Sequence, residues 1–259
     1  MRTVDVNYRK FFRNRTQHIE VPERWEDLKP HQFEVCAQLH TDPPGDEEFI
    51  RRFFGLDKKV IRSLCKFEIF KLTEIVGFTV VPAATTSYFY LQEISGTGLL
   101  APTNRLGNMC LEQFALMDTY FFKYVNETSE RRLCEFVAAL YLKRNEVLTQ
   151  IDYTRRVDYV AKNVDKYTLY AIFLNYLFVR KWLARSFKYL FDDGEEEENP
   201  RRRKAKPEKP TKQLPKWVEI IDNFVGEDVL HYDDYTRMNC IRAFKIMNNR
   251  IKNYKKNGK

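Results

Sequence analysis

Apolar and polar residues alternate near the N-terminus and then recur at helical spacing over most of the remaining chain. Residues 3–7 (TVDVN) and 17–21 (QHIEV) alternate as two paired edge strands do, and Pro22 ends the second strand. Residues 78–95 are rich in β-branched and aromatic side chains, which favours a second, inserted β-hairpin or two short strands. We therefore expect strands mainly in these two places.

Apolar residues at helical spacing predict helices elsewhere. We expect one helix to begin at Pro30, a residue favoured in the first helical turn, and a short one over residues 46–54. Gly55 suits the left-handed residue that ends a helix, and Asp57 can cap a longer helix from Lys58 to about Val76. Further helices are predicted at about 109–125, 129–145, 153–165, 167–191, 215–225 and 233–256. The sequence thus predicts a mainly α fold, a helical bundle body that carries two β-hairpins.

Residues 192–213 interrupt the helical pattern with a charged, proline-containing segment. Acidic residues at 192–198 are followed by a basic run at 201–212. Such a segment has no apolar surface to bury, so we expect an extended or disordered flexible linker. It would tether a C-terminal helical pair to the body of the protein.

The tethered pair carries apolar side chains that should be covered, either by the same chain or by a partner. Two helices of this length bury little surface alone, so we expect the pair to dock onto a neighbouring subunit or a different protein of the same assembly. The residues predicted to bind that partner are Trp217, Met238, Ile241, Phe244, Met247 and Ile251.

The expected elements divide the chain into four parts. Residues 1–22 form a basic N-terminal hairpin or arm, and residues 23–191 form the helical body with the β insertion near 78–95. Residues 192–213 are the linker, and residues 214–259 are the C-terminal helical pair.

The net charge of +8 belongs mainly to the two ends of the chain. Residues 1–22 carry five basic and two acidic side chains, whereas residues 242–259 carry seven basic side chains and no acidic one. The acidic and basic parts of the linker cancel, which leaves the predicted body close to neutral. Basic ends suit arms that contact an anionic partner such as DNA non-specifically, and simple solvated tails would have the same composition.

Cysteine usage and hydropathy indicate a protein that is not secreted and not in a membrane. The five cysteines are widely spaced and form no CxxC pair, which favours buried, reduced thiols over a zinc site. The N-terminal segment lacks the apolar stretch of a signal peptide. The longest helix-compatible uncharged run, Tyr167–Val179, is too short to span a bilayer.

Motifs of catalysis and cofactor binding are missing or lack their context. The run Gly96–Ala101 (GTGLLA) fits a dinucleotide-binding pattern, but Pro102 and Gly107 interrupt the helix that would have to follow it. A phosphate-binding P-loop and a GxSxG elbow are absent, and the four histidines share no metal-ligand spacing. We therefore expect no enzymatic activity, no metal and no cofactor.

Residues 47–66 are the candidate for direct nucleic-acid contact. Two predicted helices joined by a three-residue turn with glycine resemble a helix-turn-helix, and an ordinary αα-hairpin would look the same. The cations that the second helix would present are Lys58, Lys59, Arg62 and Lys66.

Three segments resemble proteins from the structural gene clusters of tailed phages and prophages of gut anaerobes. The segments are Val21–Phe33 (VPERWEDLKPHQF), Met109–Phe114 (MCLEQF) with its echo Leu133–Tyr141 (LCEFVAALY), and the closing helices that begin Pro215–Ile221 (PKWVEII). The resemblance implies a small helical virion or tail-assembly component without enzymatic activity, and it identifies no site residues.

These observations together favour a non-catalytic structural or assembly component of a tailed-phage virion, at the neck, the tail or near the portal. Its expected partners are other copies of itself, as a homo-oligomer, and other virion proteins, and its expected location is the virion or the host cytoplasm during assembly. The first alternative is a DNA-binding regulator or packaging accessory that uses the helix-turn-helix-like segment and the basic termini. The second is an enzyme of a mobile element.

Overall fold

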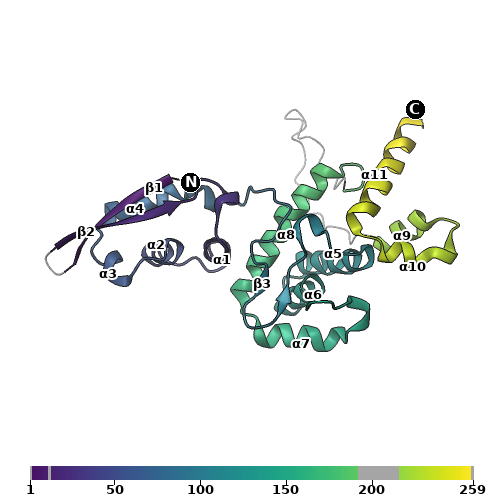
Figure 1. Cartoon of the computed structure of the whole chain (residues 1–259), viewed down its shortest axis with the longest axis horizontal. Helices are drawn as coiled ribbons and strands as arrows, with labels where there is room; N and C mark the ends of the chain where they lie inside the picture. The colour runs from purple at the N-terminus through teal and green to yellow at the C-terminus, as the bar shows by residue number, and fades with distance from the viewer. Residues whose placement is uncertain (1, 11–12, 192–215, 258–259) are drawn as a thin grey trace, which may run out of the picture. The chain divides into compact units, whose positions relative to one another are not determined.

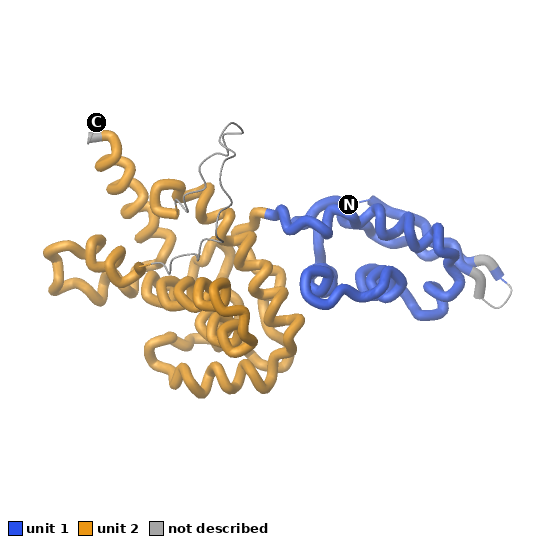
Figure 2. Tube along the Cα trace, turned by 180° about the vertical axis from the view of Figure 1, so that it is seen from behind, with its two compact units in different colours: residues 1–84 blue, residues 85–259 orange. Residues whose placement is uncertain are grey.

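The structure is a computed structural model that describes residues 2–10, 13–191 and 216–257. The described residues form eleven α-helices and two small antiparallel sheets of two strands each, which confirms the predicted mainly α class (Figure 1). The chain folds into two compact units, residues 1–84 and residues 85–259 (Figure 2). The predicted linker 192–213 lies outside the described residues.

Unit 1 begins with the predicted N-terminal hairpin. Strand β1 (Arg2–Lys10) pairs antiparallel with β2 (Arg13–Val21), in a register that sets Val6 opposite Gln17. Because opposite residues share a face of the ladder, Val6, Ile19 and Val21 lie on one side, and all three are buried. The alternation in the sequence marks the face that packs against the rest of unit 1, where β2 contacts α2.

Four helices complete unit 1. They are α1 (Pro30–Gln38), α2 (Asp46–Phe54), α3 (Lys58–Ile61) and α4 (Lys66–Ile75), with 3-10 turns at Trp25–Asp27 and Gly77–Val80. The rings of Trp25, Phe33 and Phe53 are buried between them. The side chain of Gln32 ties α1 to α2, since its Nε2 donates to the carbonyl of Phe53 while its Oε1 accepts from the backbone N–H of Lys29.

The prediction of a single helix from Lys58 to about Val76 is wrong, because two helices, α3 and α4, lie in that range. The hydroxyl of Ser63 donates to the carbonyl of Val60 at 2.6 Å, an alternative to continuing the helix. The carboxylate of Glu68 then accepts from the backbone N–H of Cys65 and closes a capping box at the start of α4.

Unit 2 carries the second sheet later in the chain than the sequence predicted. Strands β3 (Glu93–Ile94) and β4 (Leu99–Leu100) form it, and residues 78–92 contain no strand. The buried amide of Asn175 explains the difference. Its Nδ2 donates to the carbonyl of Tyr88 at 3.0 Å, and its Oδ1 accepts from the backbone N–H of Tyr90 at 2.7 Å. The Asn175 side chain therefore forms hydrogen bonds with backbone groups that would otherwise be free to bond a neighbouring strand.

The helices of unit 2 pack mainly around α5 and α6. They are α5 (Leu111–Asn126), α6 (Glu130–Leu140), α7 (Tyr153–Asn163), α8 (Lys166–Ser186), α9 (Trp217–Val225), α10 (Tyr232–Arg237) and α11 (Cys240–Asn257), with 3-10 turns at Asn104–Leu106, Leu148–Gln150 and Val229–His231. Helix α6 ends earlier than expected because the backbone N–H of Leu142 donates to the carbonyl of Leu100 in a β-bridge. Among the described helices, none has both the length and the apolar composition needed to cross a membrane.

The final helix of the sequence prediction is also two helices, α10 and α11. The chain leaves helical geometry at Met238, whose carbonyl accepts from the backbone N–H of Leu111 at 2.9 Å. The backbone N–H of Cys240 donates to the carbonyl of Met109, so the break is a short backbone bridge to the start of α5. Asn239 restarts the helix, because its Oδ1 accepts from the backbone N–H of Ile241.

The thiols differ in exposure enough to predict their reactivity. Burial raises the pKa of Cys36, Cys134 and Cys240, which disfavours the reactive thiolate, whereas Cys65 is exposed. We expect a disulfide reagent such as DTNB to modify Cys65 first in the folded protein. Substitution Cys65→Ser should remove the fast phase, and denaturant should release the buried thiols. A fast phase that survives Cys65→Ser would show that half-buried Cys110 or one of the buried thiols is also readily reached.

Candidate interaction surfaces

The apolar stripe of the last helix lies largely inside unit 2. Phe244 is fully buried, and its ring centroid is 4.8 Å from that of Phe114 and 5.1 Å from that of Phe191. Trp217 and Met247 are also buried, whereas the other predicted partner-binding residues are half-buried, namely Met238, Ile241 and Ile251. This corrects the expectation that the pair needs a neighbouring subunit. The aromatic side chains of α5 and of the segment after α8 cover the stripe within the same chain.

A buried carboxylate joins three helices of unit 2. Asp118 of α5 accepts from the hydroxyl of Tyr176 at 2.7 Å and from Nη1 of Arg180 at 2.5 Å, both from α8. Its other oxygen accepts from Nε1 of Trp217, the first residue of α9, at 2.9 Å. The guanidinium of Arg180 also lies over the ring of Phe122. Helix α9, which follows the linker in sequence, is thus attached to the body by a hydrogen bond as well as by packing.

Burial and the carboxylate of Asp118 raise the pKa of Tyr176 well above its usual range, so its phenol is a neutral donor. Sequence reasoning missed this network. The sequence feature that indicates it is a single acidic residue, Asp118, inside the mainly apolar and aromatic run ALMDTYFF. A lone carboxylate at such a position requires donors from elsewhere in the fold.

The cations of the helix-turn-helix-like segment lie on the surface of unit 1. Lys58 and Lys59 open α3, Arg62 ends it, Lys66 opens α4, and all four side chains are exposed. Helix α3 has only four residues, about one turn, so the segment lacks a second helix of the length that enters a DNA groove. The helix-turn-helix interpretation therefore loses the element on which it depended.

Helix α4 of unit 1 exposes an apolar face. Phe67 and Phe70 are 62% and 55% exposed, which is unusual for rings of this size. The ammonium of Lys71 lies 4.5 Å from the centre of the Phe67 ring. Glu74 falls on the same side at helical spacing. We call Phe67, Phe70, Lys71 and Glu74 the α4 face.

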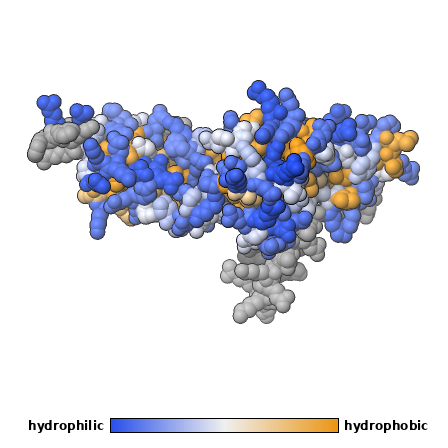
Figure 3. All heavy atoms as spheres, turned by 90° about the horizontal axis from the view of Figure 1, so that it is seen from below, coloured by the Kyte–Doolittle hydropathy of each residue, from blue (hydrophilic) through white to orange (hydrophobic). Residues whose placement is uncertain are grey.

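Unit 2 carries an open groove between α5, α9 and α10. Its volume is about 530 Å³, and three exposed apolar side chains line it, namely Leu116, Val218 and Tyr232. Its charged lining residues are Glu112, Asp233 and Arg237. We call this the α5–α9–α10 groove. Figure 3 shows exposed apolar atoms gathered in separate groups on a mostly hydrophilic surface.

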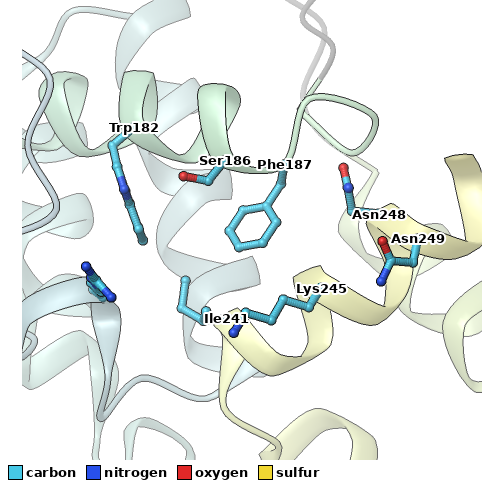
Figure 4. Close-up of a pocket in the computed structure, with 8 residues that line it drawn as sticks. Trp182, Ser186, Phe187, Ile241, Lys245, Asn248 and Asn249 are labelled. Atoms are coloured by element: carbon cyan, nitrogen blue, oxygen red, sulfur yellow. The ribbon is translucent and has the colours of Figure 1, made fainter.

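A second, basic pocket of about 460 Å³ lies between α8 and α11. Trp182 and Ser186 of α8 and Phe187 directly after it approach the pocket from one side, and Ile241 and Lys245 approach it from α11 (Figure 4). Its lining is completed by Asn248 and Asn249 of α11 and by Arg105. None of the described residues that line this space is acidic, and we call it the α8–α11 pocket.

A strained turn delivers Arg105 to this pocket. Arg105 and Leu106 both have left-handed backbones, with φ of 57° and 53°, although neither is glycine. The backbone N–H of Arg105 donates to the carbonyl of Ser87, and Nδ2 of Asn239 donates to the carbonyl of Leu106 at 3.1 Å. Because left-handed geometry disfavours residues with a Cβ, these contacts are what hold the turn in place.

Compared with family models, curated proteins and solved structures, the chain matches none of them. The described residues likewise contain no group of three or more side chains that could hold a metal ion. Three surface features of the described residues are candidates to carry function, namely the α4 face, the α5–α9–α10 groove and the α8–α11 pocket.

Proposed function

We propose that the chain is a non-catalytic structural or assembly component of a tailed-phage virion that acts through oligomeric protein–protein contacts. The virion setting comes from the resemblance of Val21–Phe33, Met109–Phe114 and Pro215–Ile221 to proteins of phage structural gene clusters. The observation that supports the oligomeric part is the presence of two exposed apolar surfaces, one on each unit of the chain. The occupant we propose for each is the other surface, on a second copy.

The two surfaces complement each other in shape and in charge. The α4 face is a convex helix with two exposed rings, and the α5–α9–α10 groove is concave with apolar walls. Each side also carries both signs of charge. Lys71 can meet Glu112, and Glu74 can meet Arg237. The ion pair between Arg237 and Asp233, at 3.5 Å, is highly exposed and so costs little to rearrange.

Such a contact joins different surfaces of identical chains. A head-to-tail interface of this kind produces a closed ring where its rotation closes and an open filament where it does not. Repeated identical contacts would give the homo-oligomer, and free surfaces at its rim would be left for other virion proteins. The location implied is the virion, or the host cytoplasm during assembly. Capsid or tail genes beside the coding sequence would support this setting.

Blocking each surface separately gives a direct test. Substitutions Phe67→Asp with Phe70→Asp block the α4 face, and Leu116→Asp with Val218→Asp block the groove. Each blocked protein should elute as a monomer at concentrations where the unaltered chain associates, because a charge in an apolar contact is costly. Light scattering after size exclusion measures the mass.

Mixing the two blocked proteins makes the test specific. One intact α4 face and one intact groove remain in the mixture, so it should form a dimer and nothing larger. Tyr254→Asp, at an exposed position on α11, serves as the control and should associate normally. An unaltered chain that stays monomeric, or a mixture that does, would refute the proposed self-contact.

A further inference from the structure

The outer face of α11 carries a continuous row of polar and basic side chains. Arg242, Lys245, Asn249, Lys252 and Lys256 follow one another at alternating spacings of three and four residues. That spacing places them along one side of an α-helix. The opposite side of the same helix is buried in unit 2 through Cys240, Ala243, Phe244 and Met247. We call Arg242, Lys245, Lys252 and Lys256 the basic stripe.

Among the residues that the structure describes, the cations of the stripe have no acidic partner. Within the described part of the chain, no carboxylate forms an ion pair with Arg105 or with any cation of the basic stripe. By contrast, Arg250 of the same helix points elsewhere, since its Nη1 donates to the carbonyl of Phe224. Cations aligned on a helix in this way produce a positive potential that favours an extended anionic ligand.

The α8–α11 pocket opens beside the first turns of this stripe. Lys245 belongs to both, and Arg105 adds a second cation from the strained turn. The amide of Asn248 is oriented, because its Oδ1 accepts from the backbone N–H of Tyr189 at 2.9 Å, and its Nδ2 is then a donor. Strain retained at a turn that presents a cation to a polar pocket points to a ligand-binding role.

We propose that the basic stripe and the α8–α11 pocket together bind the sugar-phosphate backbone of double-stranded DNA. The stripe from Arg242 to Lys256 extends about 21 Å at roughly 1.5 Å per residue. A stretch of duplex of that length carries about six phosphates on each strand, at roughly one per 3.4 Å of axis, which is enough to provide partners for the cations of the stripe. Arg105 and Lys245 in the pocket would clamp one of these phosphates.

Other anionic partners fit these features less well. A helix that lies on a membrane inserts its apolar face into the lipid, but that face of α11 already packs in the core of unit 2. A protein interface needs an apolar centre, which the stripe lacks. Proteins that bind single strands stack successive bases on several rings, whereas Trp182 is the half-buried ring of the pocket and Phe187 is buried.

The binding would position the protein on DNA without reading its sequence. Lysine and arginine contacts to phosphate carry no base information, and they release counterions. With five cations engaged, the logarithm of the binding constant should fall with the logarithm of salt concentration with a slope of about −4.5. This function is independent of the proposed self-contact, because no residue of the basic stripe or of the α8–α11 pocket belongs to the α4 face or lines the groove.

The test compares two variants of the full chain that lose the same charge. The first, Arg242→Gln, Lys245→Gln, Lys252→Gln and Lys256→Gln, removes the stripe. The second removes the cations of unit 1 and consists of Lys58→Gln, Lys59→Gln, Arg62→Gln and Lys66→Gln. Fluorescence anisotropy with a labelled mixed-sequence duplex measures affinity over a range of salt concentrations. Circular dichroism checks that both variants fold.

We expect the stripe variant to bind at least about tenfold more weakly and to lose most of its salt dependence. The unit 1 variant should bind as the unaltered chain does. Equal weakening of both variants would show that only net charge matters and would overturn the proposal. Loss in the unit 1 variant alone would do so too. So would binding of phosphatidylglycerol vesicles, lost in the stripe variant, without any binding of the duplex.

Tryptophan emission tests the pocket itself. Trp25 and Trp217 are buried, whereas Trp182 lines the pocket and is half-buried, so added duplex should change mainly the emission of Trp182. Trp182→Phe should remove that change, and Arg105→Gln should weaken both the change and the affinity. An emission change that persists in Trp182→Phe would exclude the pocket from the DNA site.

Discussion

Replacing Asp118 by alanine is expected to lower the free energy of unfolding of unit 2 by roughly 3–5 kcal/mol, because a buried cation loses its counter-charge. The guanidinium of Arg180 is 11% exposed and would be left without the carboxylate that faces it. The hydroxyl of Tyr176 and the indole N–H of Trp217 would each lose an acceptor as well. Removing this one carboxylate therefore takes an acceptor away from three donors at once.

Urea titration followed by tryptophan emission measures this loss, in a Trp25→Phe background so that the remaining tryptophans report on unit 2 alone. The matched control is Asp158→Ala. Asp158 pairs with Arg131 at 2.6 Å, but both side chains are at least half exposed. That substitution should cost less than about 1 kcal/mol. Equal losses for the two variants would show that the Asp118 network contributes no more than a surface ion pair.

Replacing Phe244 by alanine is expected to cost roughly 3–5 kcal/mol and to release α9–α11 from the body of unit 2, because it leaves a cavity between aromatic rings. Phe244 contacts rings from three parts of the chain, including Phe114, Phe187 and Trp217. Because residues 192–215 separate the body from α9 in sequence, packing and the Trp217 hydrogen bond supply the attachment.

Hydrogen exchange distinguishes release of these helices from general unfolding. In Phe244→Ala, residues 216–257 should lose protection while residues 2–84 of unit 1 keep theirs. Tyr254→Ala is the control on the same helix, since Tyr254 is 80% exposed and its loss should change stability by less than about 0.5 kcal/mol. Full protection of residues 216–257 in Phe244→Ala would show that other contacts hold α11.

Local patterns in the sequence were sufficient where the deciding interactions are local. The alternation in residues 3–7 and 17–21 predicted the N-terminal hairpin because one face of it is buried, and the side chains of Val6 and Ile19 lie on that face. The starts of α7 and α8 fall within a residue of the prediction. Asp152 and Asp165 cap them by accepting backbone N–H bonds from residues two or three positions away.

Contacts between distant residues decided what local patterns could not. Helix α6 stops where Leu142 pairs with Leu100, and the final helix breaks where Met238 and Cys240 bond to the start of α5. Asn175 holds residues 88–90 away from a strand although their composition favours one. In each case a hydrogen bond across many residues outweighs a propensity of less than about 1 kcal/mol per residue.

The candidate surfaces also depend partly on local spacing and partly on contacts between distant residues. Periodicity alone predicted the apolar side of the final helix, because that side follows from spacing within one helix, and composition alone showed that the end of the chain is basic. What covers the apolar side was decided only by the tertiary structure, where Phe114 and Phe191 pack on Phe244. The α8–α11 pocket also exists only in the fold. Arg105, Trp182 and Lys245 are far apart in the chain, and no rule of spacing relates them, so their proximity depends on the packing of α8 against α11.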